Sequence, residues 1–129
     1  MLFSILKRRA NAYLTYKRYS AIYQKYKDFS MIPMETYIGN LILCERFKEI
    51  GGCIVECGVW RGGMIGGFAE ILGNQRSYFL FDSFEGLPEA KEIDGKAAIN
   101  WQNDKQSPNY FNNCAAEMKF AENAMKRSG

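Results

Sequence analysis

The chain has 129 residues, of which 47% are hydrophobic, and its formal net charge is +3. This length and composition are typical of an ordinary globular chain with at most one domain. Histidine is absent, which excludes Ser-His-Asp and Cys-His catalytic groups and histidine metal ligands, and no apolar run approaches the roughly eighteen residues that span a bilayer.

The first predicted element is a basic helix over residues 3–27. Residues 1–30 contain seven Lys and Arg side chains and a single acid, so this arm carries +6 and the remainder of the chain −3. Tyrosines recur in the arm at helical spacing, at Tyr16, Tyr19, Tyr23 and Tyr26, and therefore share one stripe. We expect the stripe to dock onto the rest of the protein, with a dimer seam and an interfacial membrane helix as the alternatives. The predicted organisation is a tyrosine-rich arm over residues 1–30 and an incomplete α/β domain over residues 31–129.

The next elements are a helix and then a strand–helix–strand unit. The helix is predicted to begin after Pro33 and to end at the pair Gly51-Gly52. The first strand is an almost continuous apolar run, which is typical of a parallel strand covered on both faces. The predicted ranges are 34–50 for the helix, 53–57 for the first strand, 62–72 for the following helix and 77–81 for the second strand. The predicted fold class is therefore α/β, with a parallel sheet of about two strands in this chain.

The rest of the chain begins with a polar stretch over residues 83–109, which reads as a long loop. A connection of more than twenty residues without a core of its own is unusual and favours a functional lid. A final helix is predicted over residues 110–127, with Ser128-Gly129 as its C-cap.

The four cysteines are Cys44, Cys53, Cys57 and Cys114, and they show neither a CxxC pair nor metal-ligand spacing. Cys53 and Cys57 fall on the predicted first strand, where a free thiol behaves as a small buried apolar side chain. We therefore expect reduced thiols and a cytoplasmic protein.

The turn from the first strand into the next helix is the first candidate site. It reads Glu56-Cys57-Gly58-Val59-Trp60-Arg61-Gly62-Gly63 and ends at a helix start, whose unpaired N–H groups suit a carboxylate or a phosphate. Trp60 stands where a dinucleotide-binding turn needs a glycine, so a pyrophosphate has no clear seat here. Glu56 can hold an ammonium group, and its alternative is to stabilise the turn. Such glycine turns also serve helix–strand packing, which is the alternative for Gly58 and Gly62.

Asp82, at the end of the second strand, is the second candidate site. It lies twenty residues beyond Gly62, and its carboxylate can accept hydrogen bonds from both hydroxyls of a ribose. The alternative is that Asp82 caps the turn over residues 83–88.

Other polar and aromatic side chains near these turns carry weaker signals. Arg61 is expected to be exposed and to form a surface salt bridge, for example with Glu85. Trp60 and Trp101 could stack on a flat ring but are expected to serve packing. The loop acids Glu92, Asp94 and Asp104 are too scattered to predict a metal site.

Two tight motifs, residues 55–63 and residues 81–88, and more loosely the helix over residues 110–129, resemble the macrocin-type O-methyltransferases. This family uses S-adenosylmethionine to methylate sugar hydroxyls of antibiotics and related glycosides. The resemblance extends over about residues 34–129 and does not include the arm.

The resemblance implies a class I methyltransferase fold, a Rossmann-like parallel sheet, and it implies roles for individual residues. The methionine moiety would be held by Glu56, Cys57, Gly58, Val59, Gly62 and Gly63. Asp82 would hold the ribose, Ser83 and Phe84 would lie beside the adenosine, and the loop after Pro88 would help to close over the acceptor. Magnesium-binding acids and a candidate base lie on later strands of the family, so no catalytic or metal-binding residue is assigned in this chain. We expect the chain to be the cofactor-binding, N-terminal portion of such an enzyme.

Two further readings come from other classes of protein. A nucleotide-sugar or NAD-binding enzyme could use the same strand–helix–strand unit, although Trp60 argues against it. An inactive interaction module could use the basic arm to bind a partner or an anionic membrane. The favoured reading predicts a small-molecule acceptor, no nucleic acid and a possible homo-oligomer, with membrane contact by the arm as the less favoured option.

Overall fold

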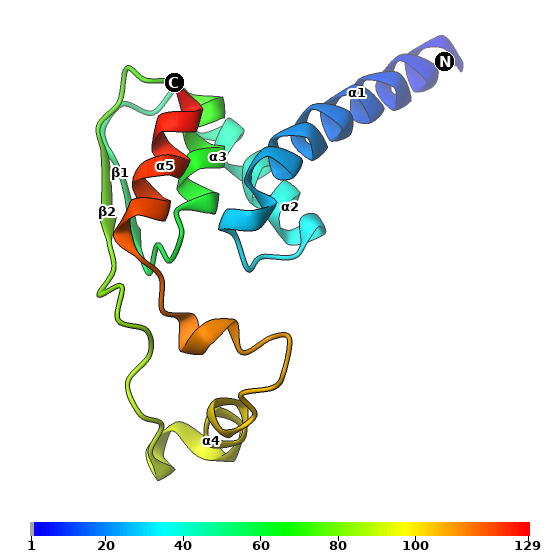
Figure 1. The fold of residues 1–129 in the computed structure, drawn as a ribbon. Helices are drawn as coiled ribbons and strands as arrows, with labels where there is room; N and C mark the ends of the chain where they lie inside the picture. Colours follow the sequence, from blue (N-terminus) through cyan, green and yellow to red (C-terminus); the bar gives the residue numbers. More distant parts are fainter. Residues whose placement is uncertain (1) are drawn as a thin grey trace.

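The computed structural model describes residues 2–129, with side chains from residue 6 onwards except at residue 8. In chain order the elements are α1 (Leu2–Tyr26), η1 (Lys27–Phe29), α2 (Met34–Arg46), β1 (Ile54–Cys57), α3 (Gly63–Leu72), β2 (Tyr78–Phe81), η2 (Glu92–Asp94), α4 (Gly95–Asn103), η3 (Phe111–Cys114) and α5 (Met118–Ser128). Figure 1 shows α3 and α5 on the same side of the two strands, with α1 and α2 beyond them. Within residues 2–129, no helix is both long and apolar enough to cross a membrane.

The sheet consists of β1 and β2 in parallel, with Ile54 opposite Tyr78 and Cys57 opposite Phe81. α3 connects the two strands, so the predicted strand–helix–strand unit is confirmed. On the helical side, inward-facing strand residues pack against a small core of Val59, Ile65 and Ala121. Side chains alternate across a strand, so only every second residue reaches this core.

The other face of the sheet is not covered by any part of residues 2–129. Val55, Phe79 and Phe81 on this face are 55%, 49% and 57% exposed. The prediction of a first strand covered on both faces is therefore wrong for the described chain, because both layers of helices lie on one side (Figure 1). The predicted burial of Cys53 and Cys57 is wrong for the same reason, and both thiols are exposed.

The predicted arm helix is confirmed as α1, and its last turns dock onto α2 and α3. Tyr19 and Tyr26 are almost fully buried, whereas Tyr16 is 48% exposed. Tyr23 packs edge-on against Tyr37 of α2, with ring centroids 5.4 Å apart. Docking of the tyrosine stripe is thus confirmed for its last three members, while the first half of α1 projects away from the rest of the protein (Figure 1).

Glycines of α3 allow the tyrosine rings to lie directly on the helix. A Cβ at Gly66 would lie 2.6 Å from the ring of Tyr26, and one at Gly67 would overlap the hydroxyl group of Tyr37. The hydroxyl of Tyr37 donates a hydrogen bond to the carbonyl oxygen of Gly63, at 2.7 Å. These contacts join α1, α2 and α3 into one core, so the end of the arm and the α/β unit pack as one body.

Two predicted helices have different bounds in the structure. The predicted helix over residues 34–50 ends at Arg46, because the chain tightens into turns in which Phe47 and Ile50 donate to carbonyls three residues earlier. The predicted helix over residues 110–127 begins only at Met118. Asn112 and Asn113 adopt left-handed φ values of 54° and 55°, a conformation that asparagine tolerates and that breaks a right-handed helix.

The predicted loop over residues 83–109 contains a helix, α4, which the sequence did not reveal. Gly95, with φ of 83°, turns the chain into α4, and Ala97, Ala98 and Ile99 continue it. α4 packs on η2 and lies away from the sheet (Figure 1). This segment therefore has its own local structure without joining the main core.

Candidate functional site

The loops that follow β1 and β2 meet at the carboxyl ends of the two strands. The backbone N–H of Gly58 donates to the carbonyl oxygen of Phe81 at 2.8 Å, which extends the strand pairing by one residue. This pairing brings Glu56, Gly58 and Asp82 to one edge of the sheet, because the carboxyl ends of parallel strands lie together. The two sequence-predicted acids therefore belong to a single site.

Asp82 connects the two loops through both oxygens of its carboxylate. Oδ2 accepts a hydrogen bond from the backbone N–H of Trp60 at 2.8 Å, and Oδ1 accepts one from the N–H of Phe84 at 2.7 Å. Both donors have left-handed backbones, with φ of 49° at Trp60 and 59° at Phe84. The turn-capping alternative for Asp82 is thus what the structure shows. Each oxygen keeps a second lone pair, so the carboxylate can still accept hydrogen bonds from a ligand.

Glu56 lines a cavity of about 90 Å³ on the inner side of the first loop. Its Oε2 is buried and has no hydrogen-bond partner among the described residues. Burial raises the pKa of Glu56 to about 7, the nearby Asp82 charge adds to this rise, and a hydrogen bond from the Ile65 backbone opposes it. A buried carboxyl oxygen without a donor is costly, and an ammonium group or another cation would satisfy it.

The glycines of the first loop divide into one open position and two packing positions. Gly58 has φ of 81°, and a Cβ there would meet nothing within 4 Å. By contrast, a Cβ at Gly62 would lie 2.9 Å from Cα of Ala121 in α5, and one at Gly63 would lie 2.5 Å from the carbonyl oxygen of Phe29. Gly58 thus leaves room for a close ligand, whereas the packing alternative holds for Gly62 and Gly63.

The remaining predicted site residues occupy different surroundings. Val59 is buried in the core with Ile65, and Cys57 is exposed on the uncovered face of the sheet. Ser83 accepts a hydrogen bond from the N–H of Glu85 at 3.3 Å and so shapes its own turn. Phe84 is half-buried and lines an open cavity of about 380 Å³ between the second loop and the start of α5. The structure therefore brings Glu56, Gly58, Asp82, Ser83 and Phe84 to the strand ends.

Arg61 is half-buried, so the prediction that it is exposed is wrong. It does not form the predicted salt bridge with Glu85 or with any other acid of the described residues. Its guanidinium lies 4.4 Å from the ring centroid of Trp60 and 4.7 Å from that of Phe120. It also donates a hydrogen bond to the carbonyl oxygen of Asp28 at 3.3 Å. Arg61 therefore holds the first loop against α5 by a cation–π contact and against η1 by a hydrogen bond.

The two tryptophans serve packing, as expected. Trp60 packs edge-on against Phe111, with centroids 5.9 Å apart. Trp101 packs against Tyr110 and donates its indole N–H to the carbonyl oxygen of Asn109.

One wall of the Glu56 cavity consists of residues that sequence reasoning missed. Phe29 at the end of η1, and Ser30, Met31 and Ile32 between η1 and α2, lie against the first loop. Pro33 signalled a break in the helix, but no pattern in this stretch indicates that it returns to the strand ends. The predicted boundary between residues 30 and 31 passes through this wall.

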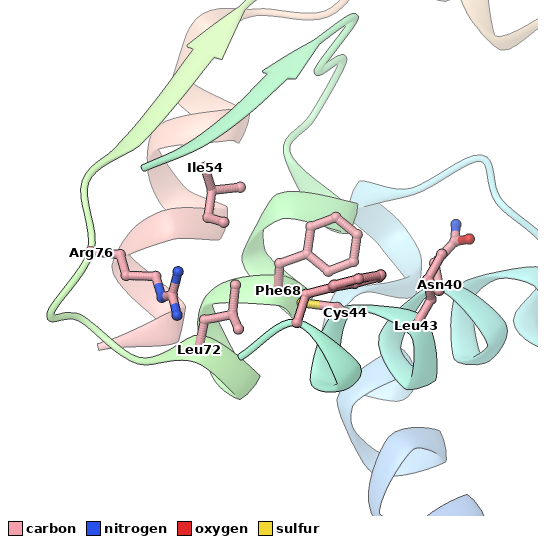
Figure 2. Close-up of a pocket in the computed structure, with 8 residues that line it drawn as sticks. Asn40, Leu43, Cys44, Ile54, Phe68, Leu72 and Arg76 are labelled. Atoms are coloured by element: carbon pink, nitrogen blue, oxygen red, sulfur yellow. The ribbon is translucent and has the colours of Figure 1, made fainter. Parts of the chain in front are cut away.

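An apolar cavity that is larger than the one around Glu56 lies near the opposite, amino ends of the strands. Figure 2 shows it between α2 and α3, with Leu43, Phe68 and Leu72 on its walls and Ile54 at the start of β1 beside it. Its volume is about 260 Å³, and Arg76 is the one charged residue that lines it within residues 2–129. It lies at the far end of β1 from Gly58 and is separate from the candidate site.

Metal-binding side chains do not gather in the described part of the chain. Within residues 2–129, no three His, Cys, Asp or Glu side chains are placed to hold one ion. The candidate site therefore consists of two acids, an open glycine and aromatic neighbours.

Comparison with known protein families gives a match over most of the chain. The family model described as Macrocin-O-methyltransferase (TylF) matches residues 34–119, which contain both strands, both loops and the cavity around Glu56 apart from Phe29–Ile32. Comparisons with curated proteins and with solved structures find no match.

Proposed function

Because the chain belongs to the macrocin-O-methyltransferase (TylF) family, we propose that it binds S-adenosylmethionine at the ends of β1 and β2 for transfer of a methyl group to a hydroxyl oxygen. Membership in the family supports a methyltransferase. The bound cofactor would supply a methyl group on a sulfonium, an electrophile that needs no further activation. We also propose that β1, α3 and β2 form part of a class I, Rossmann-like methyltransferase sheet.

The buried, unpartnered Oε2 of Glu56 is the observation that carries this proposal. The methionine moiety has an ammonium group, and a carboxylate in a small cavity is a suitable acceptor for it. Gly58 adds an open stretch of backbone beside the same cavity. The residues present thus fit the ammonium end of the cofactor, with Glu56 in its ionised form as the acceptor.

The ribose end of the cofactor is assigned to Asp82, and the adenosine to the neighbourhood of Ser83 and Phe84. Each carboxylate oxygen of Asp82 already accepts one hydrogen bond, Oδ2 from the backbone N–H of Trp60 and Oδ1 from that of Phe84. These bonds fix the orientation of the carboxylate, so its remaining lone pairs face a constant direction. A preoriented acceptor loses less freedom when it binds two hydroxyl groups.

We propose a sugar hydroxyl of a glycoside as the acceptor class, which is what the resemblance to the macrocin-type O-methyltransferases implies. Methyl transfer to such a hydroxyl requires alignment of the oxygen and removal of its proton. No residue of this chain is assigned as the base, and no ligand is assigned for the magnesium that the resemblance implies.

Isothermal titration calorimetry with S-adenosylmethionine and with NAD tests the proposal. We expect S-adenosylmethionine to bind and NAD not to bind. Glu56→Gln should weaken the binding by on the order of 1–3 kcal/mol, because it removes one charged hydrogen bond. Glu89→Gln, which changes an exposed carboxylate of the long segment, is the matched control and should leave the affinity unchanged. Absence of S-adenosylmethionine binding, or equal binding of NAD, would contradict the proposal.

A further inference from the structure

The first half of α1 is an exposed helix with no partner among the described residues, although it carries large apolar side chains. Leu6, Tyr13, Leu14 and Tyr16 are 55%, 65%, 60% and 48% exposed. Figure 1 shows this half of the helix projecting away from α2 and α3. An isolated helix of a few turns gains little from its own hydrogen bonds, so a surface that buries these side chains would stabilise it.

The exposed apolar residues form a stripe of their own. Leu6, Ala10, Tyr13 and Leu14 follow one another at spacings of four, three and one, so they lie on one side of the helix. Tyr26, which lies at the centre of the docked side, is thirteen residues beyond Tyr13, a rotation of roughly 220° around the helix. The exposed stripe therefore faces away from the protein's core and is not an undocked extension of the tyrosine stripe.

Basic side chains border the exposed stripe. Relative to Leu6, Lys7 lies roughly 100° to one side and Arg9 roughly 60° to the other. Lys17, one turn beyond Tyr13, lies at the end of the stripe itself. All three side chains are exposed, and none forms an ion pair within the described part of the chain. Arg18 at the base of the exposed half does pair, with Glu45 of α2 at 3.0 Å. The projecting segment thus combines an apolar stripe with uncompensated positive charge.

We propose that this half of α1, residues 6–17, lies on anionic lipid membranes as an interfacial helix. Leucine and tyrosine would enter the boundary between headgroups and acyl chains, while lysine and arginine would reach lipid phosphates on either side. This proposal concerns a surface contact and is independent of the proposed methyl transfer.

The charge pattern favours a lipid surface over a second copy of the chain. Residues 1–18 contain five basic residues and no acid, so two arms side by side would place like charges together. A nucleic acid would pair with the basic residues but would leave Leu6, Tyr13 and Leu14 in water. An anionic bilayer accommodates both the charge and the apolar stripe.

Vesicle co-sedimentation tests the proposal with the whole 129-residue protein. The probes are vesicles of phosphatidylcholine mixed with phosphatidylglycerol and vesicles of phosphatidylcholine alone. We expect binding to the mixed vesicles, at least about tenfold weaker binding to the neutral ones, and weakening by high salt. Failure to bind the mixed vesicles at low salt would overturn the proposal.

Paired variants separate the two contributions. Tyr13→Ser with Leu14→Ser should reduce binding to the mixed vesicles about tenfold or more, and so should Lys7→Ser with Arg9→Ser. Lys96→Ser with Lys105→Ser removes the same charge from exposed positions outside the arm and should leave the binding nearly unchanged. If that control is equally weakened, or if the apolar pair has no effect, the attraction is unspecific and the proposal is wrong. Loss of a dimer in the arm variants, measured by sedimentation equilibrium without vesicle binding, would instead identify a second copy as the partner.

Discussion

The backbone N–H of Trp60 donates a hydrogen bond to Oδ2 of Asp82 at 2.8 Å, although the two residues follow different strands. The same carboxylate accepts a hydrogen bond from Phe84 at 2.7 Å and therefore fixes both loops at once. Asp82, which the sequence predicts to bind a ribose, thus also holds the two loops of the site together. Experiments on Asp82 have to measure stability as well as ligand binding.

Replacement of Asp82 should lower stability even without a ligand. Asp82→Ala removes two hydrogen bonds to a charged acceptor, and we expect the free energy of unfolding to fall by roughly 2–4 kcal/mol. Urea denaturation followed by circular dichroism measures this loss. Asp104→Ala, at an exposed loop position, is the control and should change the stability little. An unchanged denaturation midpoint for Asp82→Ala would show that the two loops do not depend on this carboxylate.

Stability should also depend on pH through Glu56. Its pKa is raised by burial to about 7 in the folded protein, from 4.5 in the unfolded chain. Between these values the folded state binds more protons, so the stability falls as the pH rises from about 4.5 to about 7, by on the order of 3 kcal/mol in total. Above that range the loss is complete and constant.

Comparison of wild type with Glu56→Gln isolates this effect. The variant cannot ionise at this position, so its denaturation midpoint should change less than that of the wild type between about pH 5 and about pH 8. At about pH 8 its midpoint should exceed that of the wild type. If an ammonium group binds at Glu56, affinity for S-adenosylmethionine in the wild type should rise through the same range, because the ionised carboxylate is the better acceptor. If the denaturation midpoints of the two proteins change with pH in the same way, the pH dependence does not come from Glu56.

The two left-handed glycines of the first loop should respond differently to alanine. Gly62→Ala combines an unfavourable positive φ with a Cβ only 2.9 Å from the backbone of α5. Gly58→Ala suffers the unfavourable φ alone, because the space around it is open. We expect Gly62→Ala to be less stable than Gly58→Ala by roughly 1–3 kcal/mol in urea denaturation. Equal losses would mean that the approach of α5 to this loop is not tight.

Tyr37 should contribute to the start of α3 through its hydroxyl group. Tyr37→Phe removes a buried hydrogen bond of 2.7 Å to the carbonyl of Gly63 and should cost about 1 kcal/mol of stability. Tyr16→Phe, which alters a half-exposed ring of α1, serves as the comparison and should cost much less. Urea denaturation of the two variants measures the difference. Equal midpoints would show that the Tyr37 hydroxyl does not stabilise the start of α3.

The strand–helix–strand unit and the docked tyrosines were predictable because their signals are local. Apolar runs, a glycine turn and rings at helical spacing each lie within a short stretch of chain. α4 was not predictable in the same way, since it is short, lies in a stretch rich in polar residues and does not pack on the main core. The break at Asn112 and Asn113 was also missed, because the flanking apolar pattern reads as one continuous helix.

The candidate site was predictable in its acids but not in its contacts. The positions of Glu56 and Asp82 at strand ends follow from the order of elements, which is why both were identified. The bond from Trp60 to Asp82 depends on a left-handed backbone at a bulky residue, which no residue pattern reveals. Likewise, the wall formed by Met31 and its neighbours results from the way α1 packs, which is a property of the whole fold.

The rings of Tyr26 and Tyr37 lie against glycines of α3, and α3 begins where the first loop ends. At Gly66 and Gly67 these rings lie directly on the backbone of α3, so the three helices are in close contact here. Because α1 and α3 share one core, the orientation of the projecting helix is coupled to that of the strand ends. A surface that binds the projecting half of α1 would therefore also set the direction in which the opening beside Gly58 faces.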